Sequence, residues 1–268
     1  MNDKAKDQPG KLNVKRDGHI GIIEFDNQHK FNAVNMEMWQ DVAKAIGEFT
    51  EDRNIRVVML QGAGEKAFVS GADISQFGEK RDSAEAQAIY NAAVEGGYKS
   101  VFNCPKPTIA KIRGVCMGGG LGLAGYCDIR YCSDDAKFRM PAARLGLGYG
   151  FDGLERFASI IGPANTSDLF FSARIFGAAD ALQMGFVSKV LPVAEIESFV
   201  KGYCTMITEN APLTVAASKR SMLEMRKDHK DRDLAAVAKM VAACFDSADY
   251  KEGRTAFMEK RTPNFRGE

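Results

Sequence analysis

Apolar residues follow two patterns along the chain, and the pattern changes near residue 192. Before this point, short apolar runs alternate with segments whose apolar residues recur every three or four positions. The short runs predict β-strands, and the wider spacing predicts α-helices. The segments "LNVKR" and "IGIIEFD" predict a strand pair that turns at Asp17 and Gly18, and Met36–Phe49 predicts a helix with Asn35 as its N-cap.

The rest of the chain extends this alternation and then becomes helical. Strands are expected at "VVMLQG", "AFVSGADI", "PTIAKIRGV" and "DIRYCSD", and a helix over Ala84–Phe102. This order indicates an α/β layer architecture. Beyond residue 192, helices are expected over Val193–Glu209, Pro212–His229 and Arg232–Phe245. The last two mix apolar and charged residues, which is typical of helices that pack on the core or on a neighbouring subunit. We therefore expect a core over 1–192 and a C-terminal helical region over 193–268.

Composition narrows the class of protein. The 36 Lys and Arg residues nearly balance 35 Asp and Glu residues, so no global field attracts nucleic acid or anionic membrane. The N-terminal segment lacks the apolar core of a secretory signal, and no apolar run is long enough to span a bilayer. Six scattered cysteines without a C-x-x-C motif indicate buried thiols rather than a disulfide framework or a zinc site. We expect a cytoplasmic protein with no metal site, membrane partner or nucleic-acid partner.

The stretch "MGGGLGLAGYCD" (Met117–Asp128) contains the pattern G-x-G-x-x-G, which also occurs in dinucleotide-binding loops. Such a loop requires a long helix after the glycines and an acidic residue about 20 residues further on. Here "DIRYCS" begins three residues after Gly125, and the nearest strand-end acids, Asp134 and Asp135, come too soon. The nucleotide interpretation is therefore disfavoured.

Glycines at a helix N-terminus can also expose backbone N–H groups to a developing oxyanion. The segment "AFVSGADISQF" (Ala67–Phe77) could supply a second such donor, because its small residues let the backbone approach a ligand. Either loop alone is compatible with a simple tight turn. Two such loops in one α/β chain favour an oxyanion hole.

Five motifs resemble the crotonase superfamily, also called the enoyl-CoA hydratase/isomerase family, and they occur in the family's order over almost the full length. They are "KFNAVNMEM" (Lys30–Met38), "AFVSGADI" (Ala67–Ile74), "PKPTIAKIRGVCMGGGLGLAGYCDIRYCSDDAKF" (Pro105–Phe138), "ALQMGFVSKVLP" (Ala181–Pro192) and "FMEKRTPNF" (Phe257–Phe265).

The resemblance implies a spiral of repeated ββα units with C-terminal helices that assemble a homotrimer or a dimer of trimers. It also implies an acyl-CoA thioester as substrate, with no prosthetic group. The oxyanion-hole donors would be the amides of Ala72 and Gly119. Coenzyme A would pass Lys30 and Ala33, with its adenine near Ser70, Asp73 and Ile74. Phe257 and Lys260 would close over the nucleotide, often from a neighbouring subunit.

Two departures from the family pattern affect the expected chemistry. Hydratases of the family carry one glutamate three residues after the oxyanion glycine, and that position here is Gly122. Their second glutamate follows the proline of an "F-x-x-P-E" segment, and the matching "FRMPAA" places Ala142 there. Adding water across a double bond needs a base for the water and an acid for Cα, and neither residue can serve.

The segment "RLGLGYGFDGLERF" offers other candidate side chains. Arg144 stands where some members carry an acid or base, and it could pair with a substrate carboxylate. Tyr149 resembles a tyrosine of the methylmalonyl-CoA decarboxylase branch. Asp152 and Glu155 are further titratable candidates. Three functions stay open: a CoA-thioester lyase acting through an enolate, such as a decarboxylase; a hydratase or isomerase with unusual acid–base groups; and a non-catalytic acyl-CoA-binding protein.

Overall fold

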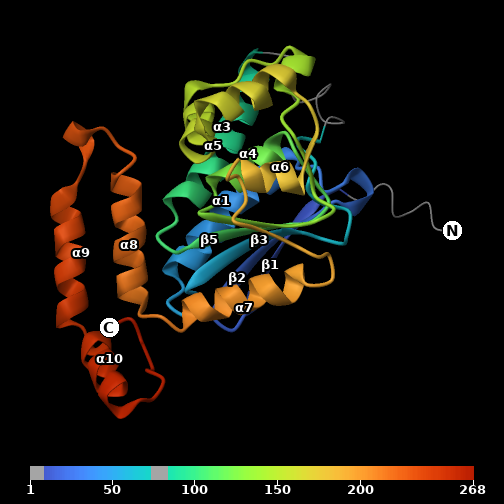
Figure 1. Ribbon diagram of the computed structural model, residues 1–268. Coiled ribbons are helices and arrows are strands. Elements are labelled where there is room, and N and C mark those ends of the chain that lie inside the picture. The colour runs from blue at the N-terminus through green and yellow to red at the C-terminus, as the bar shows by residue number, and fades with distance from the viewer. Residues whose placement is uncertain (1–8, 74–83) are drawn as a thin grey trace.

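The protein, described here by a computed structural model over residues 9–73 and 84–268, is built on two β-sheets with helices around them (Figure 1). The larger sheet has the strand order β1-β2-β3-β5-β7-β10. Only β1 and β2 pair antiparallel, and the other neighbours in this sheet are parallel. Its strands are β1 (Lys11–Asp17), β2 (Ile20–Asp26), β3 (Val57–Gly62), β5 (Thr108–Ile112), β7 (Ile129–Ser133) and β10 (Lys189–Leu191).

The smaller sheet has the order β4-β6-β8-β9. Its strands are β4 (Ala67–Val69), β6 (Val115–Met117), β8 (Lys137–Arg139) and β9 (Phe176–Gly177). In chain order, β3, β5 and β7 of the larger sheet are each followed by β4, β6 and β8 of the smaller one. A helix then follows each pair: α3 (Ala84–Asn103), α4 (Gly119–Tyr126) and α5 (Phe151–Ser172). The expected repeat of ββα units is therefore confirmed.

One strand expected from the sequence in this region was wrong. "PTIAKIRGV" was expected to form one strand, but Gly114 has a φ of +63° and turns the chain between β5 and β6. The two halves therefore join different sheets. The predicted hairpin and the helix after it are confirmed, and the Asn35 side chain caps α1 (Met36–Glu51) by accepting from the Met38 N–H.

The central parallel strands of the larger sheet are buried on both faces, as expected of parallel strands. Val58 and Leu60 of β3 point into the main core, which α1, α3 and α4 share. Val57 and Met59 point to the opposite face, which α7 (Ile196–Thr208) covers. Figure 1 shows α7 on one side of the sheet and α1, α3, α4, α5 and α6 (Ala178–Gln183) on the other.

The C-terminal helices form an arm at the side of the sheet (Figure 1). The arm consists of α8 (Pro212–Glu224), α9 (Leu234–Asp246) and α10 (Ala248–Glu259). The helix expected over Pro212–His229 ends earlier, because His229–Asp231 forms a separate short 3-10 helix, η5. Helix α10 was not predicted. Among the described residues, no helix is both long enough and apolar enough to cross a membrane. The cysteines are all free, and all but the half-buried Cys244 are buried.

A buried ion pair attaches the arm to the core. Lys219 of α8 is 5 % exposed, and its Nζ lies 2.7 and 2.5 Å from the Asp128 carboxylate oxygens. Asp128 follows α4, and it also accepts from the backbone N–H and the hydroxyl of Thr108. The Lys219–Asp128 pair therefore connects α8 to the segment that leads into β7.

We predict that Lys219→Ala lowers the free energy of unfolding by about 2–4 kcal/mol, because it leaves the Asp128 charge without its cation. Urea denaturation measures this loss. The control is Lys201→Ala, whose partner Asp17 is largely exposed, and which should cost less than about 1 kcal/mol. Equal losses in the two variants would contradict this role for Lys219.

Candidate active site

Two backbone segments that are distant in the sequence meet beside the smaller sheet. One follows β4 and contains Gly71 and Ala72, and the other joins β6 to α4 and contains Gly118 and Gly119. A β-carbon placed on Gly71 would lie 3.8 Å from the Gly119 nitrogen and 3.4 Å from the Met117 oxygen. The structure thus brings together the two segments that were predicted to form an oxyanion hole.

The β6–α4 turn depends on glycine at position 118. Its φ of +50° and ψ of −118° are those of the first central residue of a type II′ turn, which strongly favours glycine. The turn is held by two backbone bonds: the Gly118 N–H donates to the Arg139 oxygen, and the Gly122 N–H donates to the Gly118 oxygen. Gly119 is the first residue of α4, so its own N–H has no acceptor within the helix.

An isolated parallel β-bridge between Ala72 and Val34 sets the direction of the Ala72 N–H. The Val34 N–H donates to the Gly71 oxygen at 2.8 Å, and the Asp73 N–H donates to the Val34 oxygen at 2.9 Å. In a parallel bridge, the residue between these two partners points its own amide away from the bridging strand. Within the described part of the chain, nothing accepts from the Ala72 N–H, so this group can bind a ligand.

The residues expected along coenzyme A form one cluster near the short 3-10 helix η2 (Gln28–Lys30). The Lys30 ammonium lies 2.9 and 3.1 Å from the Asp73 carboxylate oxygens, and the Ser70 hydroxyl donates to the Lys30 carbonyl. Ala33 is buried beside them, and its N–H donates to the Lys30 oxygen. Ile74 lies outside the described residues.

Buried asparagines shape this cluster. The Asn32 side chain accepts from the Asn27 N–H and donates to the Ala63 and Ala67 oxygens, which ties the loop to the start of β4. Phe31 and Asn32 both have positive φ values, so the chain reverses sharply here. The Lys30 region is therefore held by buried hydrogen bonds.

Phe257 and Lys260 do not join this cluster within one chain. Both lie at the end of α10, where Phe257 is 82 % exposed. The tail after α10 is fixed by Arg56, whose guanidinium donates to the Phe265 oxygen beside the start of β3. Lys30 follows the end of β2, which runs parallel to β3, so the two regions lie at opposite ends of the sheet.

Position 122, where the first hydratase glutamate was expected to be missing, lies close to two tyrosine hydroxyls. A β-carbon placed on Gly122 would lie 2.5 Å from the Tyr98 oxygen and 3.3 Å from the Tyr149 oxygen. The Tyr98 hydroxyl donates to the Gly119 carbonyl at 2.9 Å. The Tyr149 hydroxyl donates to no described residue. Glycine at 122 therefore leaves room for phenols, not for a carboxylate.

Burial keeps both phenols protonated. It raises the pKa of Tyr98 well above its ordinary value of 10.0, and the neighbouring Tyr149 hydroxyl raises it further. Burial also raises the pKa of Tyr149, with a smaller contribution from Tyr126. At neutral pH the two side chains are hydrogen-bond donors, and neither is a base.

The other candidates from the sequence lie further out. Ala142 is buried and follows Pro141, whose ring would be 3.7 Å from a β-carbon on Gly118. Arg144 is exposed on η4 (Ala142–Leu145), and its guanidinium has no partner in the described parts of the chain. Asp152, in the first turn of α5, is exposed, and its charge acts on Lys99 and Tyr126. Glu155 is also exposed.

Sequence reasoning missed Tyr98 and Trp39, which pack directly against the α4 turn. The Trp39 ring lies 3.2 Å from a β-carbon placed on Gly119 and meets the Tyr98 ring edge-on at 5.2 Å. Both residues come from helices whose apolar spacing indicated only core packing. No local signal distinguished them from other core aromatics.

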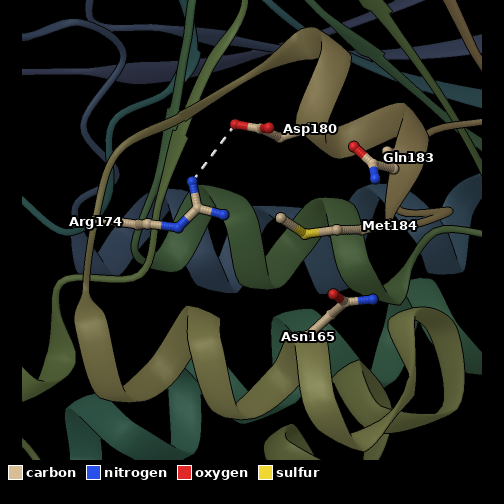
Figure 2. Close-up of a pocket in the computed structure, with 5 residues that line it drawn as sticks. All are labelled: Asn165, Arg174, Asp180, Gln183 and Met184. Carbon is tan, nitrogen blue, oxygen red and sulfur yellow. Dashed lines mark hydrogen bonds and ion pairs between the residues drawn. The ribbon is translucent and has the colours of Figure 1, made fainter.

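A pocket of about 250 Å³ lies elsewhere, between α5 and α6 (Figure 2). Asn165, Arg174, Asp180, Gln183 and Met184 line it. The Arg174 guanidinium is already paired with Asp168 and Asp180. None of these residues belongs to the two amide-bearing segments, so the pocket is not the proposed acyl site.

Comparison with known proteins shows which family the chain belongs to. The family model described as "Enoyl-CoA hydratase/isomerase" matches residues 15–268. A short-chain-enoyl-CoA hydratase of Clostridium acetobutylicum is 32 % identical over 248 residues, covering 92 % of this chain and 94 % of the relative. The carnitinyl-CoA dehydratase of Escherichia coli K12 is 32 % identical over 260 residues, covering 96 % and 98 %.

A solved structure shows the same similarity. The enoyl-CoA hydratase/carnithine racemase of Magnetospirillum magneticum has a TM-score of 0.91 and 32 % identity, with 96 % of each chain covered. The sequence motifs, the ββα repeat and these similarities lead to one conclusion. The chain belongs to the enoyl-CoA hydratase/isomerase family, the crotonase superfamily.

Proposed function

We propose that the protein binds an acyl-CoA thioester and stabilises its enolate between the Ala72 and Gly119 amides, without the two carboxylates of a hydratase. One observation carries the proposal: the Tyr98 and Tyr149 oxygens fill the space around Gly122. A glutamate there would require Tyr98 to move. With Ala142 at the second position, the site lacks both the base and the acid that syn-hydration needs.

Loss of CO₂ from a carboxyacyl-CoA suits these residues best. The bond between Cα and the carboxylate breaks, its electron pair enters the thioester enolate, and CO₂ leaves. The enolate oxygen accepts hydrogen bonds from the two amides. These bonds stabilise the enolate most when the amides are fixed in place before the reaction. Cα then takes the proton of the Tyr149 hydroxyl, and the phenolate recovers a proton from water.

Arg144 and Asp152 have supporting roles in this scheme. Arg144 has no partner among the described side chains, so it can attract the substrate carboxylate at the mouth of the site. Asp152 remains a candidate for returning a proton through solvent. We also propose that Phe257 and Lys260 reach the nucleotide from a neighbouring subunit, since their own chain holds them at the other end of the sheet.

A second function is favoured by the names of the relatives, which include a hydratase and a dehydratase. If this chain also hydrates enoyl-CoA, it must use other acid–base groups, such as Asp152 or Glu155. A non-catalytic acyl-CoA-binding role is the third possibility. The following three measurements separate these functions.

Ligand binding is tested by thermal unfolding. We expect coenzyme A or acetoacetyl-CoA at millimolar concentration to raise the melting temperature by a few degrees, since a ligand at about 100 times its Kd adds about 2.7 kcal/mol to stability. Adenosine at the same concentration is the control. An unchanged melting temperature with both CoA ligands would rule out the acyl-CoA site.

Hydration is tested by adding crotonyl-CoA and recording the loss of its enoyl absorbance. We expect a rate at least ~10³-fold below that of a two-glutamate family member assayed alongside, because each positioned acid–base group typically contributes ~10²–10⁴-fold. A comparable rate in the two enzymes would refute our interpretation of Gly122 and Ala142 and favour the hydratase.

A mass-spectrometric screen of acyl-CoAs, including methylmalonyl-CoA, first identifies the substrate. The proton donor is then tested with the Tyr149→Phe variant and methylmalonyl-CoA. We expect product formation to fall about 10²-fold or more. In the unsubstituted enzyme, kcat should stay level from about pH 6 to about pH 9, because the raised pKa of Tyr149 keeps the donor protonated there. The control is Tyr203→Phe, on the opposite face of the sheet. Full activity of Tyr149→Phe would remove this residue from the mechanism.

A further inference from the structure

We propose that Tyr98 is the positioning residue of the oxyanion hole, holding the Gly119 backbone from the place where a hydratase glutamate would stand. This inference rests on the proposed function and adds to it a residue that touches no substrate atom. Tyr98 lies on α3, and its hydroxyl reaches across to α4, where it donates to the Gly119 carbonyl at 2.9 Å.

The two peptide groups on either side of the Gly119 Cα are fixed by different donors. The peptide that carries the Gly119 N–H has the Gly118 oxygen at its other end, and that oxygen accepts from the Gly122 N–H at 3.0 Å. The next peptide is held by Tyr98. A catalytic group must lie within about 0.5 Å of its productive position, so both bonds matter for where the Gly119 N–H points.

Aromatic packing prevents Tyr98 from turning away. Its ring meets Trp39 edge-on at 5.2 Å and stacks on Tyr126 at 4.9 Å with an interplanar angle of 11°. The Trp39 ring in turn lies against Gly119. Because burial raises the pKa of Tyr98, the hydroxyl keeps its hydrogen at neutral pH and stays a donor.

Glycine at 122 and tyrosine at 98 therefore depend on each other. Any side chain at 122 would begin 2.5 Å from the Tyr98 oxygen, so the bond to Gly119 exists only while position 122 is glycine. A phenol has one hydrogen to donate, and Tyr98 gives it to Gly119. Of these two phenols, Tyr149 keeps its hydroxyl hydrogen for a ligand, so this end of the site suits an acyl group with an acceptor, such as a carboxylate.

The test is the infrared frequency of a ¹³C-labelled thioester carbonyl in bound acetoacetyl-CoA, compared between the unsubstituted enzyme and Tyr98→Phe. We expect the carbonyl band to shift to lower frequency on binding and to lose part of that shift in Tyr98→Phe. With methylmalonyl-CoA, kcat should fall about tenfold while KM stays within about twofold, as expected from loss of one hydrogen bond that positions a donor.

The matched control is Tyr126→Phe, which removes a hydroxyl from the ring stacked on Tyr98 while leaving the Gly119 bond in place. Its carbonyl band should match that of the unsubstituted enzyme. An unchanged band in Tyr98→Phe, with the ligand still bound, would overturn the positioning role but not the proposed function. Failure of the unsubstituted enzyme to bind any acyl-CoA would overturn both.

A second measurement needs no ligand and tests whether positions 98 and 122 depend on each other. Gly122→Ala should lower the melting temperature by about 4 °C or more in the unsubstituted protein, because its β-carbon overlaps the Tyr98 hydroxyl. The drop should be smaller in the Tyr98→Phe background, where the hydroxyl, the atom nearest to the added β-carbon, is absent. Equal drops in the two backgrounds would contradict the dependence of position 98 on position 122.

Discussion

The candidate site depends on the close approach of two stretches of bare backbone. The segment at Gly71 and the turn at Gly118 lie so near each other that a β-carbon on either would be within 4 Å of the other segment. The smaller sheet produces this approach, because β4 and β6 are parallel neighbours in it and each ends just before its loop. In the proposed oxyanion hole, the two amide donors belong to different ββα units whose glycine-containing backbones lie in close contact.

Under the proposed function, the chain differs from a hydratase in the side chains that meet α4 around this backbone pair. A hydratase would place a carboxylate at position 122, where it could exchange protons with water and substrate. Here the same volume holds two protonated phenols, and one of them is used to hold Gly119. A carboxylate can act as a base at neutral pH, whereas these protonated phenols cannot. The change favours reactions that generate the enolate without removing a proton.

Local features of the sequence predicted much of the fold. The hairpin at Gly18 and the Asn35 cap follow from residue type and short-range spacing, whereas the ββα repeat was implied by the resemblance to the crotonase superfamily. The break in "PTIAKIRGV" was missed because a turn at Gly114 is visible only once its two halves pair with different strands. Tyr98 was missed for a similar reason: it lies 21 residues from Gly119, in a helix whose pattern indicates ordinary core packing.

The central claim is that the two amides stabilise an enolate that forms without a carboxylate base. The most direct measurement is the mass of the product when methylmalonyl-CoA is incubated with the protein in D₂O. The account predicts propionyl-CoA carrying one deuterium at Cα for each CO₂ released. Recovery of unchanged methylmalonyl-CoA under conditions where it demonstrably binds the protein would contradict the account.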